Sequence, residues 1–286
     1  MIYVLLSVLC SVLVSVLLKL AKRIGFEVGQ AVAWNYAVAA ALAMLTLRPS
    51  LAPLRQPGVP WLALAGLGVL LPAIFLALGA SVRHAGIVRS DAAQRLSLLI
   101  SLLAAFVLFG ERLDAMKAAG CVLGLAALAG MVWRGERGGA AGDPAPHGMA
   151  RWGYPLLVFA GFGVIDILFK RVAAAGVPLG ASLLAMFALA LVVAFAIELG
   201  RRARFTLRGL LGGVLLGLCN FGNILFYLRA HRALPRDPAL VFASMNLGVV
   251  ALGALVGLWL FRERLSRLNL AALGLALLAV GLLTHG

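Results

Sequence analysis

Polar side chains deep within apolar segments are the residues of this chain that could bind another molecule. Asn220, Asn223 and Tyr227 lie in the apolar run Gly209 to Leu228 at positions i, i+3 and i+7, so they share one helix face. At about 1.5 Å per residue, Asn220 lies roughly 16 Å into this run, near the centre of a hydrocarbon core about 30 Å thick. The three side chains could line a cavity for a polar substrate, or the amides could hydrogen-bond to neighbouring helices.

Charged side chains lie near the start of the run Val88 to Phe109. Asp91 and Arg95 are four residues apart, on one helix face. They could neutralise each other, or Arg95 could bind a substrate anion. If Glu111 marks one membrane surface, Arg95 lies roughly 6 Å inside the opposite face of the core, and Asp91 and Arg89 lie at its rim.

A six-residue phrase occurs twice and indicates that the chain is a duplication. Leu108 to Leu113 reads LFGERL and Leu260 to Leu265 reads LFRERL, 152 residues apart (260 − 108). Each copy separates two long apolar runs, as a charged hairpin between membrane helices does. Glu111 and Glu263 are therefore expected to cap helices or pair with charges at these hairpins, and not to contact a substrate.

Two amides occupy equivalent depths in the two copies. Gln94 lies 17 residues before Glu111 (111 − 94), and Asn246 lies 17 residues before Glu263 (263 − 246). If both side chains face the interior, this pair of amides could line a shared cavity.

A third charged pair, Asp166 and Lys170, lies in the run Trp152 to Val172. An offset of 151 residues (166 − 15) aligns Ser15 and Lys19 with them. Counting from the start of the run puts Asp166 roughly 21 Å in and Lys170 roughly 27 Å in. The two lysines are expected to be interfacial anchors. Asp166 could carry a coupling proton, although Lys170 would favour its charged form.

The composition requires lipid as the solvent around these residues. Hydrophobic residues make up 63% of the 286 and charged residues 12%, whereas soluble domains are about 45–50% apolar and about 25% charged. The apolar runs are close to 20 residues long and do not alternate, which predicts helices and not barrel strands. The ten predicted helices cover Met1 to Leu20, Gln30 to Leu47, Trp61 to Val82, Val88 to Phe109, Ala115 to Trp133, Trp152 to Val172, Leu179 to Leu199, Gly209 to Leu228, Pro238 to Leu260 and Leu268 to Leu283.

A segment rich in glycine and proline divides the ten helices into two groups of five. We expect a first five-helix repeat at 1–133, a flexible linker at 134–150 and a second five-helix repeat at 151–286. Because five is odd, the second copy enters the membrane from the opposite side. The predicted fold is an all-α polytopic membrane protein with two inverted repeats, the plan of secondary transporters whose substrate site lies near the midplane.

Other activities lack the residues that they need. The Lys and Arg residues behind the net charge of +15 are scattered between apolar runs, which argues against nucleic acid as a partner. No Gly-Lys dipeptide occurs, so a phosphate-binding loop for ATP is absent. The four histidines and three cysteines have neither metal-ligand spacing nor a disulfide pattern. We therefore expect no cofactor, no metal and no enzyme activity.

The chain resembles the EamA-type branch of the drug/metabolite transporter superfamily. The resemblance rests on the Gly-Glu-Arg-Leu element Gly110 to Leu113, the Gly/Ala-rich helix after each copy, and the stretches Tyr227 to Ala230 and Ser244 to Gly248. It covers nearly the whole chain and departs from the family pattern at Arg262, which replaces a glycine. The resemblance implies ten-helix exporters of small metabolites and amino acids, coupled to an ion gradient or working as facilitators.

Residues and resemblance together predict a multi-pass transporter of a bacterial inner membrane that exports small polar or amphipathic metabolites, such as amino acids, by alternating access. Its expected partners are that substrate, membrane lipids and, where transport is coupled, a proton or another ion. The expected cavity residues are Asn220, Asn223, Tyr227, Asn246, Gln94, Arg95 and Asp166.

Two alternatives and the orientation stay open at this point. A lipid or lipid-linked-sugar flippase of the same fold would use a basic rim, with Arg89 and Arg95 as its candidates. A non-transporting scaffold or a membrane enzyme is the other alternative. The distribution of Lys and Arg favours termini outside the cell, whereas the resemblance implies termini in the cytoplasm.

Overall fold

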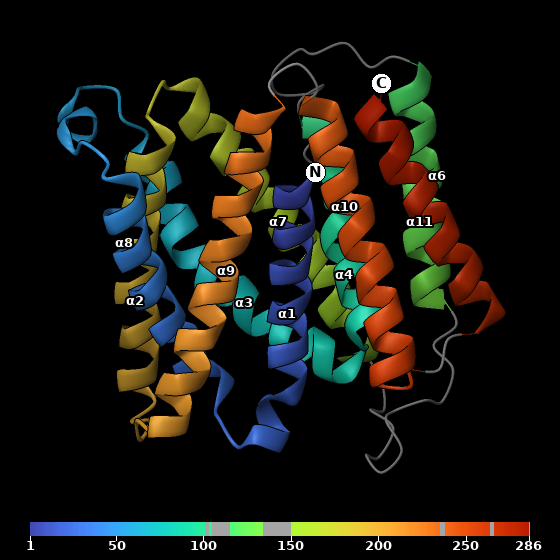
Figure 1. The fold of residues 1–286 in the computed structure, drawn as a ribbon, viewed down its shortest axis with the longest axis horizontal. Coiled ribbons are helices and arrows are strands. Elements are labelled where there is room, and N and C mark those ends of the chain that lie inside the picture. The colour runs from blue at the N-terminus through green and yellow to red at the C-terminus, as the bar shows by residue number, and fades with distance from the viewer. Residues whose placement is uncertain (101–102, 105–114, 134–149, 235–237, 264–265, 286) are drawn as a thin grey trace. The chain divides into compact units, whose positions relative to one another are not determined.

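The computed structural model describes residues 1–100, 103–104, 115–133, 150–234, 238–263 and 266–285, which form helices and the turns between them (Figure 1). Five of the helices, α1, α2, α3, α8 and α9, are long and apolar enough to cross a membrane. The chain is therefore an all-helical membrane protein, as its composition predicts. The helices are α1 Ile2–Ile24, α2 Val28–Leu47, η1 Ala52–Arg55, α3 Trp61–His84, α4 Ile87–Leu96, α6 Ala115–Trp133, α7 Ala150–Ala174, α8 Leu179–Gly200, α9 Leu207–Ala233, α10 Pro238–Leu255, η2 Val256–Leu260 and α11 Arg267–His285.

Helix α4 covers the first part of the predicted helix Val88 to Phe109. It ends at Leu96, a turn at Ser97 interrupts the helix, and residues 98–100 and 103–104 are helical again. The Ser97 hydroxyl donates a hydrogen bond to the Gln94 carbonyl oxygen (2.6 Å). A side-chain hydroxyl bonded to a carbonyl one turn back competes with the regular helix bond and favours such a break. Residues 105–109 of the predicted helix, the first copy of the phrase with Glu111, and residues 134–149 of the predicted linker lie outside the described residues.

Helix α10 also ends before its predicted boundary, and the chain continues through the single π-helical turn η2. The Phe261 amide donates to the Val256 carbonyl oxygen (3.2 Å) and closes this wider turn. A Cβ atom at Gly257 would collide with Val88, so the glycine allows η2 to approach the first turn of α4. Turns of this type are frequent at functional sites.

Two compact units make up the chain, and each combines segments from both predicted repeats. Unit 1 contains residues 1–19, 77–163 and 223–286. Unit 2 contains residues 20–76 and 164–222. Helices α1, α3, α7 and α9 contribute residues to both units.

Small apolar side chains form the core of unit 1. Helix α11 packs along α6, and α10 packs against both α4 and α11 (Figure 1). One apolar cluster joins these helices through Ala92, Val250 and Ala276, and a second joins α1, α9 and α10 through Val8 and Met245. Alanine and valine allow the helix backbones to approach closely where lipid supplies no hydrophobic driving force between helices.

A glycine face of α9 organises unit 2. A Cβ atom at Gly209, Gly213 or Gly217 would collide with α2, so α2 lies directly against this face. The four-residue spacing of these glycines predicts a close-packing face, and the structure confirms it. On another side, α2 packs against α8, where the fully buried Tyr36 ring lies 6.2 Å from the Phe187 ring.

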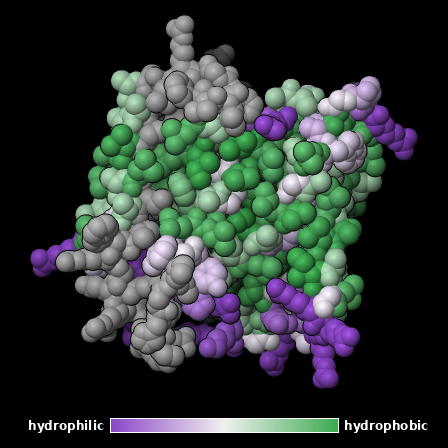
Figure 2. Space-filling view, turned by 180° about the vertical axis from the view of Figure 1, so that it is seen from behind, coloured by the Kyte–Doolittle hydropathy of each residue, from purple (hydrophilic) through white to green (hydrophobic). Residues whose placement is uncertain are grey.

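Apolar side chains also cover much of the surface (Figure 2). Hydrophobic residues fill the centre of the face shown, and hydrophilic residues gather near its edges. Large exposed apolar side chains include Leu45, Leu62, Leu207 and Trp259. In water so much apolar surface would promote aggregation, whereas in a bilayer it faces the acyl chains.

Replacing Gly213 with alanine should lower the free energy of unfolding by about 1–3 kcal/mol, because the added methyl group overpacks the contact between α9 and α2. It would meet the Ala31 carbonyl oxygen and the Trp34 side chain. Gly274→Ala on α11 is the matched control, since no atom of the described residues lies within 4 Å of its added Cβ, and it should be neutral or stabilise by up to about 1 kcal/mol. Denaturant titration in detergent measures both values, and equal stability of the two variants would contradict the packing.

Candidate functional site

Four polar residues on α1 form a stripe that we call the polar ladder: Ser7, Ser11, Ser15 and Lys19. A spacing of four residues keeps all of them on one helix face, and together they extend about 18 Å along the axis. Each residue of the polar ladder bonds to a side chain from another part of unit 1, and we call each of these contacts a rung. The partners of Ser7, Ser11, Ser15 and Lys19 are, in this order, Asn223, Arg95, Asp91 and Glu263.

The two central rungs join α1 to α4. Arg95 donates from Nη2 to the Ser11 hydroxyl oxygen (2.9 Å), and the Ser15 hydroxyl donates to Asp91 Oδ1 (2.7 Å). The residue number rises along α1 while it falls along α4, so the two helices run antiparallel here. Both serines lie two residues from Leu13, the midpoint of α1. The charges of Arg95 and Asp91 therefore lie near the middle of a membrane-spanning helix.

A third helix completes the surroundings of Arg95. Its Nη1 donates to Asn246 Oδ1 (3.2 Å), and Asn246 on α10 is buried. The guanidinium therefore donates to a hydroxyl oxygen and to an amide oxygen, and these two hydrogen bonds hold the group in place.

The first rung joins α1 to α9. The Ser7 hydroxyl lies within hydrogen-bond distance of Asn223 Oδ1 (2.8 Å) and of the Asn223 carbonyl oxygen (2.9 Å). One turn further along α9, the Tyr227 ring packs edge-on against His231, with 4.6 Å between the ring centroids. Tyr227 also packs against the apolar cluster around Val8 and Met245.

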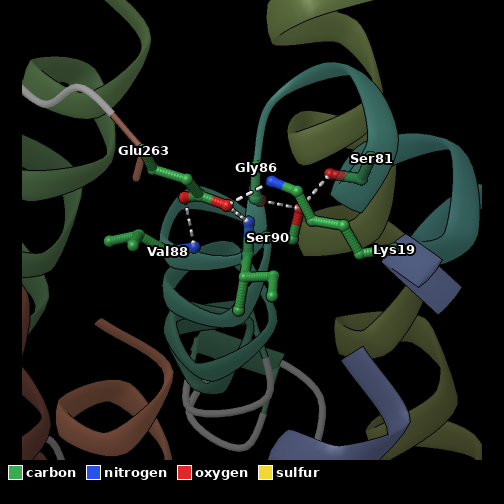
Figure 3. Close-up of polar contacts among 7 residues, drawn as sticks. Lys19, Ser81, Gly86, Val88, Ser90 and Glu263 are labelled. Carbon is green, nitrogen blue, oxygen red and sulfur yellow. Dashed lines mark hydrogen bonds and ion pairs between the residues drawn. The ribbon is translucent and has the colours of Figure 1, made fainter. Parts of the chain in front are cut away.

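The last rung is an ion pair that also caps a helix. Lys19 Nζ lies 2.5 Å from Glu263 Oε1, and the same carboxylate accepts hydrogen bonds from the amides of Ile87 (2.7 Å) and Val88 (3.3 Å) (Figure 3). These amides belong to the first turn of α4, where free N–H groups and the helix dipole favour a negative charge. We call Glu263 with Lys19 and these two amides the Glu263 junction.

Gly86 is required beside this junction. Its φ of 94° lies in the region that only glycine adopts readily, and a Cβ there would collide with the Glu263 carboxylate. The Ser90 hydroxyl bonds to the Gly86 carbonyl oxygen (2.7 Å) and lies 2.7 Å from the Ser81 hydroxyl, which fixes the turn before α4 (Figure 3).

Glu263 has the structural role that the sequence predicts. Among the described residues, helix capping and charge pairing link Glu263 to α4 and α1. Lys19 is largely buried in this ion pair (side-chain exposure 15%), and its role as an interfacial anchor stays a prediction. The Lys19 ammonium group also lies 5.1 Å from the centroid of the Phe261 ring.

The backbone at Arg262 adopts a conformation that favours glycine. Arg262 has a φ of 50°, a left-handed conformation, just before Glu263. Glycine adopts this conformation without steric cost. In the first copy of the phrase the equivalent position is occupied by Gly110 (262 − 152), which lies outside the described residues.

Arg89 and Asp91 are buried within unit 1, and Arg89 Nη2 donates to Asn269 Oδ1 on α11 (3.1 Å). The predicted depth of these residues is counted from Glu111, which lies outside the described residues. Their place at the rim of the membrane therefore stays a prediction.

Unit 1 contains five of the seven predicted cavity residues: Asn223, Tyr227, Asn246, Gln94 and Arg95. It brings Arg95 and Asn246 into direct contact, whereas the interaction described for Gln94 is the one between its carbonyl oxygen and Ser97. In unit 2, Asn220 Nδ2 donates to Asn35 Oδ1 (3.1 Å), and Asp166 is half-buried on α7. That all seven side chains line one cavity stays a prediction.

The sequence interpretation missed Ser7 and Ser11. Serine is common in membrane helices, where its hydroxyl often bonds to its own backbone, so a single serine carries little information. The regular spacing of Ser7, Ser11, Ser15 and Lys19 in an otherwise apolar helix was the signal that could have identified the polar ladder.

These features define a polytopic helical membrane protein with charged side chains held inside its bundle. A model of the EamA-like transporter family matches residues 1–133. An uncharacterized protein of Haemophilus influenzae is 40% identical over 248 residues, which cover 85% of this chain and 83% of that protein. One solved crystal structure aligns with a TM-score of 0.58 at 19% identity, over 98% of this chain and 95% of its own, and shares the fold. The chain belongs to the EamA-like transporter family, which confirms the resemblance seen in the sequence.

The Glu263 junction predicts strong energetic coupling between its two charges. In a double-mutant cycle with Lys19→Met and Glu263→Gln, we expect a coupling energy of at least about 1 kcal/mol, because both groups are largely buried. Arg201→Met with Glu198→Gln is the control pair. These groups are 3.7 Å apart and the Arg201 side chain is 64% exposed, so about 0.5 kcal/mol or less is expected. Unfolding titrations measure both cycles, and equal coupling energies would contradict the proposed difference.

The left-handed backbone predicts that Arg262→Gly stabilises the protein. Removing the steric cost of this conformation should contribute about 1 kcal/mol, reduced in part by the greater freedom of glycine in the unfolded chain. Arg262→Ala is the control, because it removes the same side chain and keeps the strained backbone. If alanine stabilised the protein as much as glycine does, the effect would come from the side chain and not from the backbone.

Proposed function

We propose that this chain is a secondary transporter that exports small polar metabolites, with amino acids as its substrate class, across a bacterial inner membrane. The observation that carries the proposal is the central pair of rungs, which holds a positive and a negative side chain near the middle of α1. Ionisable groups at this depth are costly and usually serve transport or binding. Membrane lipids surround the bundle, and no cofactor is needed for this function.

The charges of the central rungs suit a zwitterion. Arg95 can bind a carboxylate through two parallel hydrogen bonds, and its hydrogen bonds to Ser11 and Asn246 hold the guanidinium in place. Asp91 lies one helical turn away, which corresponds to about 5–6 Å between Cβ atoms. An α-amino acid presents a carboxylate and an ammonium group at a comparable separation, so both of its charges can be paired at once.

Two features support alternating access between inverted repeats. The residues Arg95 and Asn246 are 151 positions apart, one fewer than the 152 that separate the two copies of the phrase, so Arg95 meets the counterpart of its neighbour Gln94. Nearly equivalent positions meet in this way when two copies are related by a two-fold axis that passes near them. In addition, the Glu263 junction ties α1 and α4, which belong to the first predicted repeat, to a residue of the second through one ion pair and two hydrogen bonds.

The flippase alternative has less support. Its basic rim would need Arg89 and Arg95 to be accessible to a lipid headgroup. In unit 1, Arg89 is buried and bonded to Asn269, and Arg95 is bonded to Ser11 and Asn246. The two arginines therefore serve contacts between helices.

Transport by the purified protein in liposomes tests the proposal. We expect exchange of labelled amino acids above that of empty liposomes for at least one member of a panel, and at least a tenfold reduction in Arg95→Gln, since the carboxylate loses its partner. Arg201→Gln is the control, because Arg201 is exposed and lies outside the polar ladder. Absence of exchange for every amino acid, or full activity of Arg95→Gln, would contradict the proposal.

The same assay tests the predicted cavity. Asn220→Ala and Asn223→Ala should each change the rate or the substrate preference if these amides contact the substrate. Thermal unfolding supplies a binding readout, because a ligand at one hundred times its dissociation constant adds about 2.7 kcal/mol of stability. Stabilisation by an anionic lipid alone would favour the flippase.

A further inference from the structure

Asp91 has one carboxylate oxygen that no described residue satisfies. Its Oδ1 accepts the hydrogen bond from Ser15, whereas the buried Oδ2 has no hydrogen-bond partner among the described residues. The side chain is almost completely buried, since the residue is 2% exposed. Burial of a carboxylate without full hydrogen bonding is costly, so this oxygen requires a functional explanation.

Space beside this oxygen is created by a glycine. A Cβ atom at Gly253 on α10 would collide with Asp91 Oδ2. Any larger residue at position 253 would therefore displace the carboxylate or close its free side. The oxygen lies against the part of α10 that has the smallest side chain.

Two charged groups interact electrostatically with Asp91, namely Arg95 and Glu263. Its own helix also carries Arg89, which bonds to Asn269 of α11. From α1 the nearby charge of the polar ladder is Lys19, already paired with Glu263. Helix α10 has no titratable side chain, while α11 has only Arg267 and His285 at its ends, α6 has Lys117 and Cys121, and the end of α3 has Arg83 and His84.

A proton explains the arrangement better than a sodium ion. Sodium sites in transporters use backbone carbonyl oxygens freed where a membrane helix is unwound. Asp91 lies inside α4, whose carbonyl oxygens around it belong to a regular helix. A proton needs only the carboxylate itself, and carboxylates within membrane helices commonly serve as proton carriers.

We propose that Asp91 carries a coupling proton and exchanges it for the ammonium group of the substrate. This proposal rests on the proposed transport of amino acids. The neutral carboxyl releases one proton when the ammonium group arrives, and the resulting carboxylate pairs with that group while Arg95 pairs with the substrate carboxylate. After the substrate leaves, the carboxylate takes up a proton from the opposite side, so one proton moves inward for each amino acid exported.

Infrared difference spectroscopy of the purified protein tests the proton site without a substrate. Between about pH 5 and about pH 9, the wild-type protein should show a titrating carbonyl band of a protonated carboxyl group. Asp91→Asn should lose this band, whereas Asp166→Asn should keep it. A band that persists in Asp91→Asn and disappears in Asp166→Asn would assign the proton to Asp166 and overturn the proposal, as would the absence of any such band in the wild type.

Two smaller substitutions provide a second test in case Asp91→Asn does not fold. Ser15→Ala removes the hydroxyl that donates to Asp91 and should shift the pH at which the band titrates. Ser97→Ala removes a hydroxyl that bonds only to the Gln94 carbonyl oxygen among the described contacts and should leave the titration unchanged. Equal titration curves for Ser15→Ala, Ser97→Ala and the wild type would contradict the assignment of the titrating carboxyl group to Asp91.

Transport under a pH gradient separates this proposal from the proposed function. Export of the amino acid with the largest flux should accelerate at least threefold when the acceptor side is acidic, and Asp91→Asn should remove this acceleration. If the gradient accelerates Asp91→Asn as it does the wild type, Asp91 does not carry the proton although the transporter function stands. If no amino acid moves but the infrared band depends on Asp91, the transport function fails while the proton site remains.

Discussion

The cost of placing polar groups inside a lipid-embedded helix bundle determines how unit 1 is built. The helices satisfy their own backbone groups, so each charged or polar side chain at this depth needs a partner from another helix. The polar ladder on α1 supplies four such partners in sequence, and its bonds reach α9, α4 and the segment after η2. Helix α1 therefore holds together segments from both ends of the chain.

The Glu263 junction gives a physical meaning to the repeated phrase. The glutamate neutralises Lys19 and caps α4, and the preceding left-handed residue turns the chain so that its carboxylate reaches both. Gly86 and Gly257 leave the space that this contact requires. The Glu263 carboxylate thus joins α1, α4 and the segment after η2, while Asp91 and Arg95 contact α1 one and two turns before Lys19.

Depth distinguishes the rungs of the polar ladder. Lys19 lies near the end of α1 and is neutralised by a carboxylate, whereas Arg95 meets Ser11 and Asn246, which are neutral, and Asp91 meets Ser15. An ion pair with a helix cap is a stable structural contact. The hydrogen bonds described for Arg95 and Asp91 are made with hydroxyl and amide groups near the middle of α1, so the two kinds of contact differ in chemistry as well as in their place along the helix.

The sequence by itself determined the membrane class, the helix positions within a few residues and the glycine face of α9, because hydropathy and helical spacing are local properties. Only the tertiary structure decided which side chains on different helices contact each other. Ser7 and Asn223 are 216 residues apart, and no local pattern states which helix faces meet. The burial of Asp91 opposite Ser15 likewise depends on the contact between α1 and α4. The sequence of a helix shows which residues share a face, whereas the helix that covers that face depends on how the helices pack.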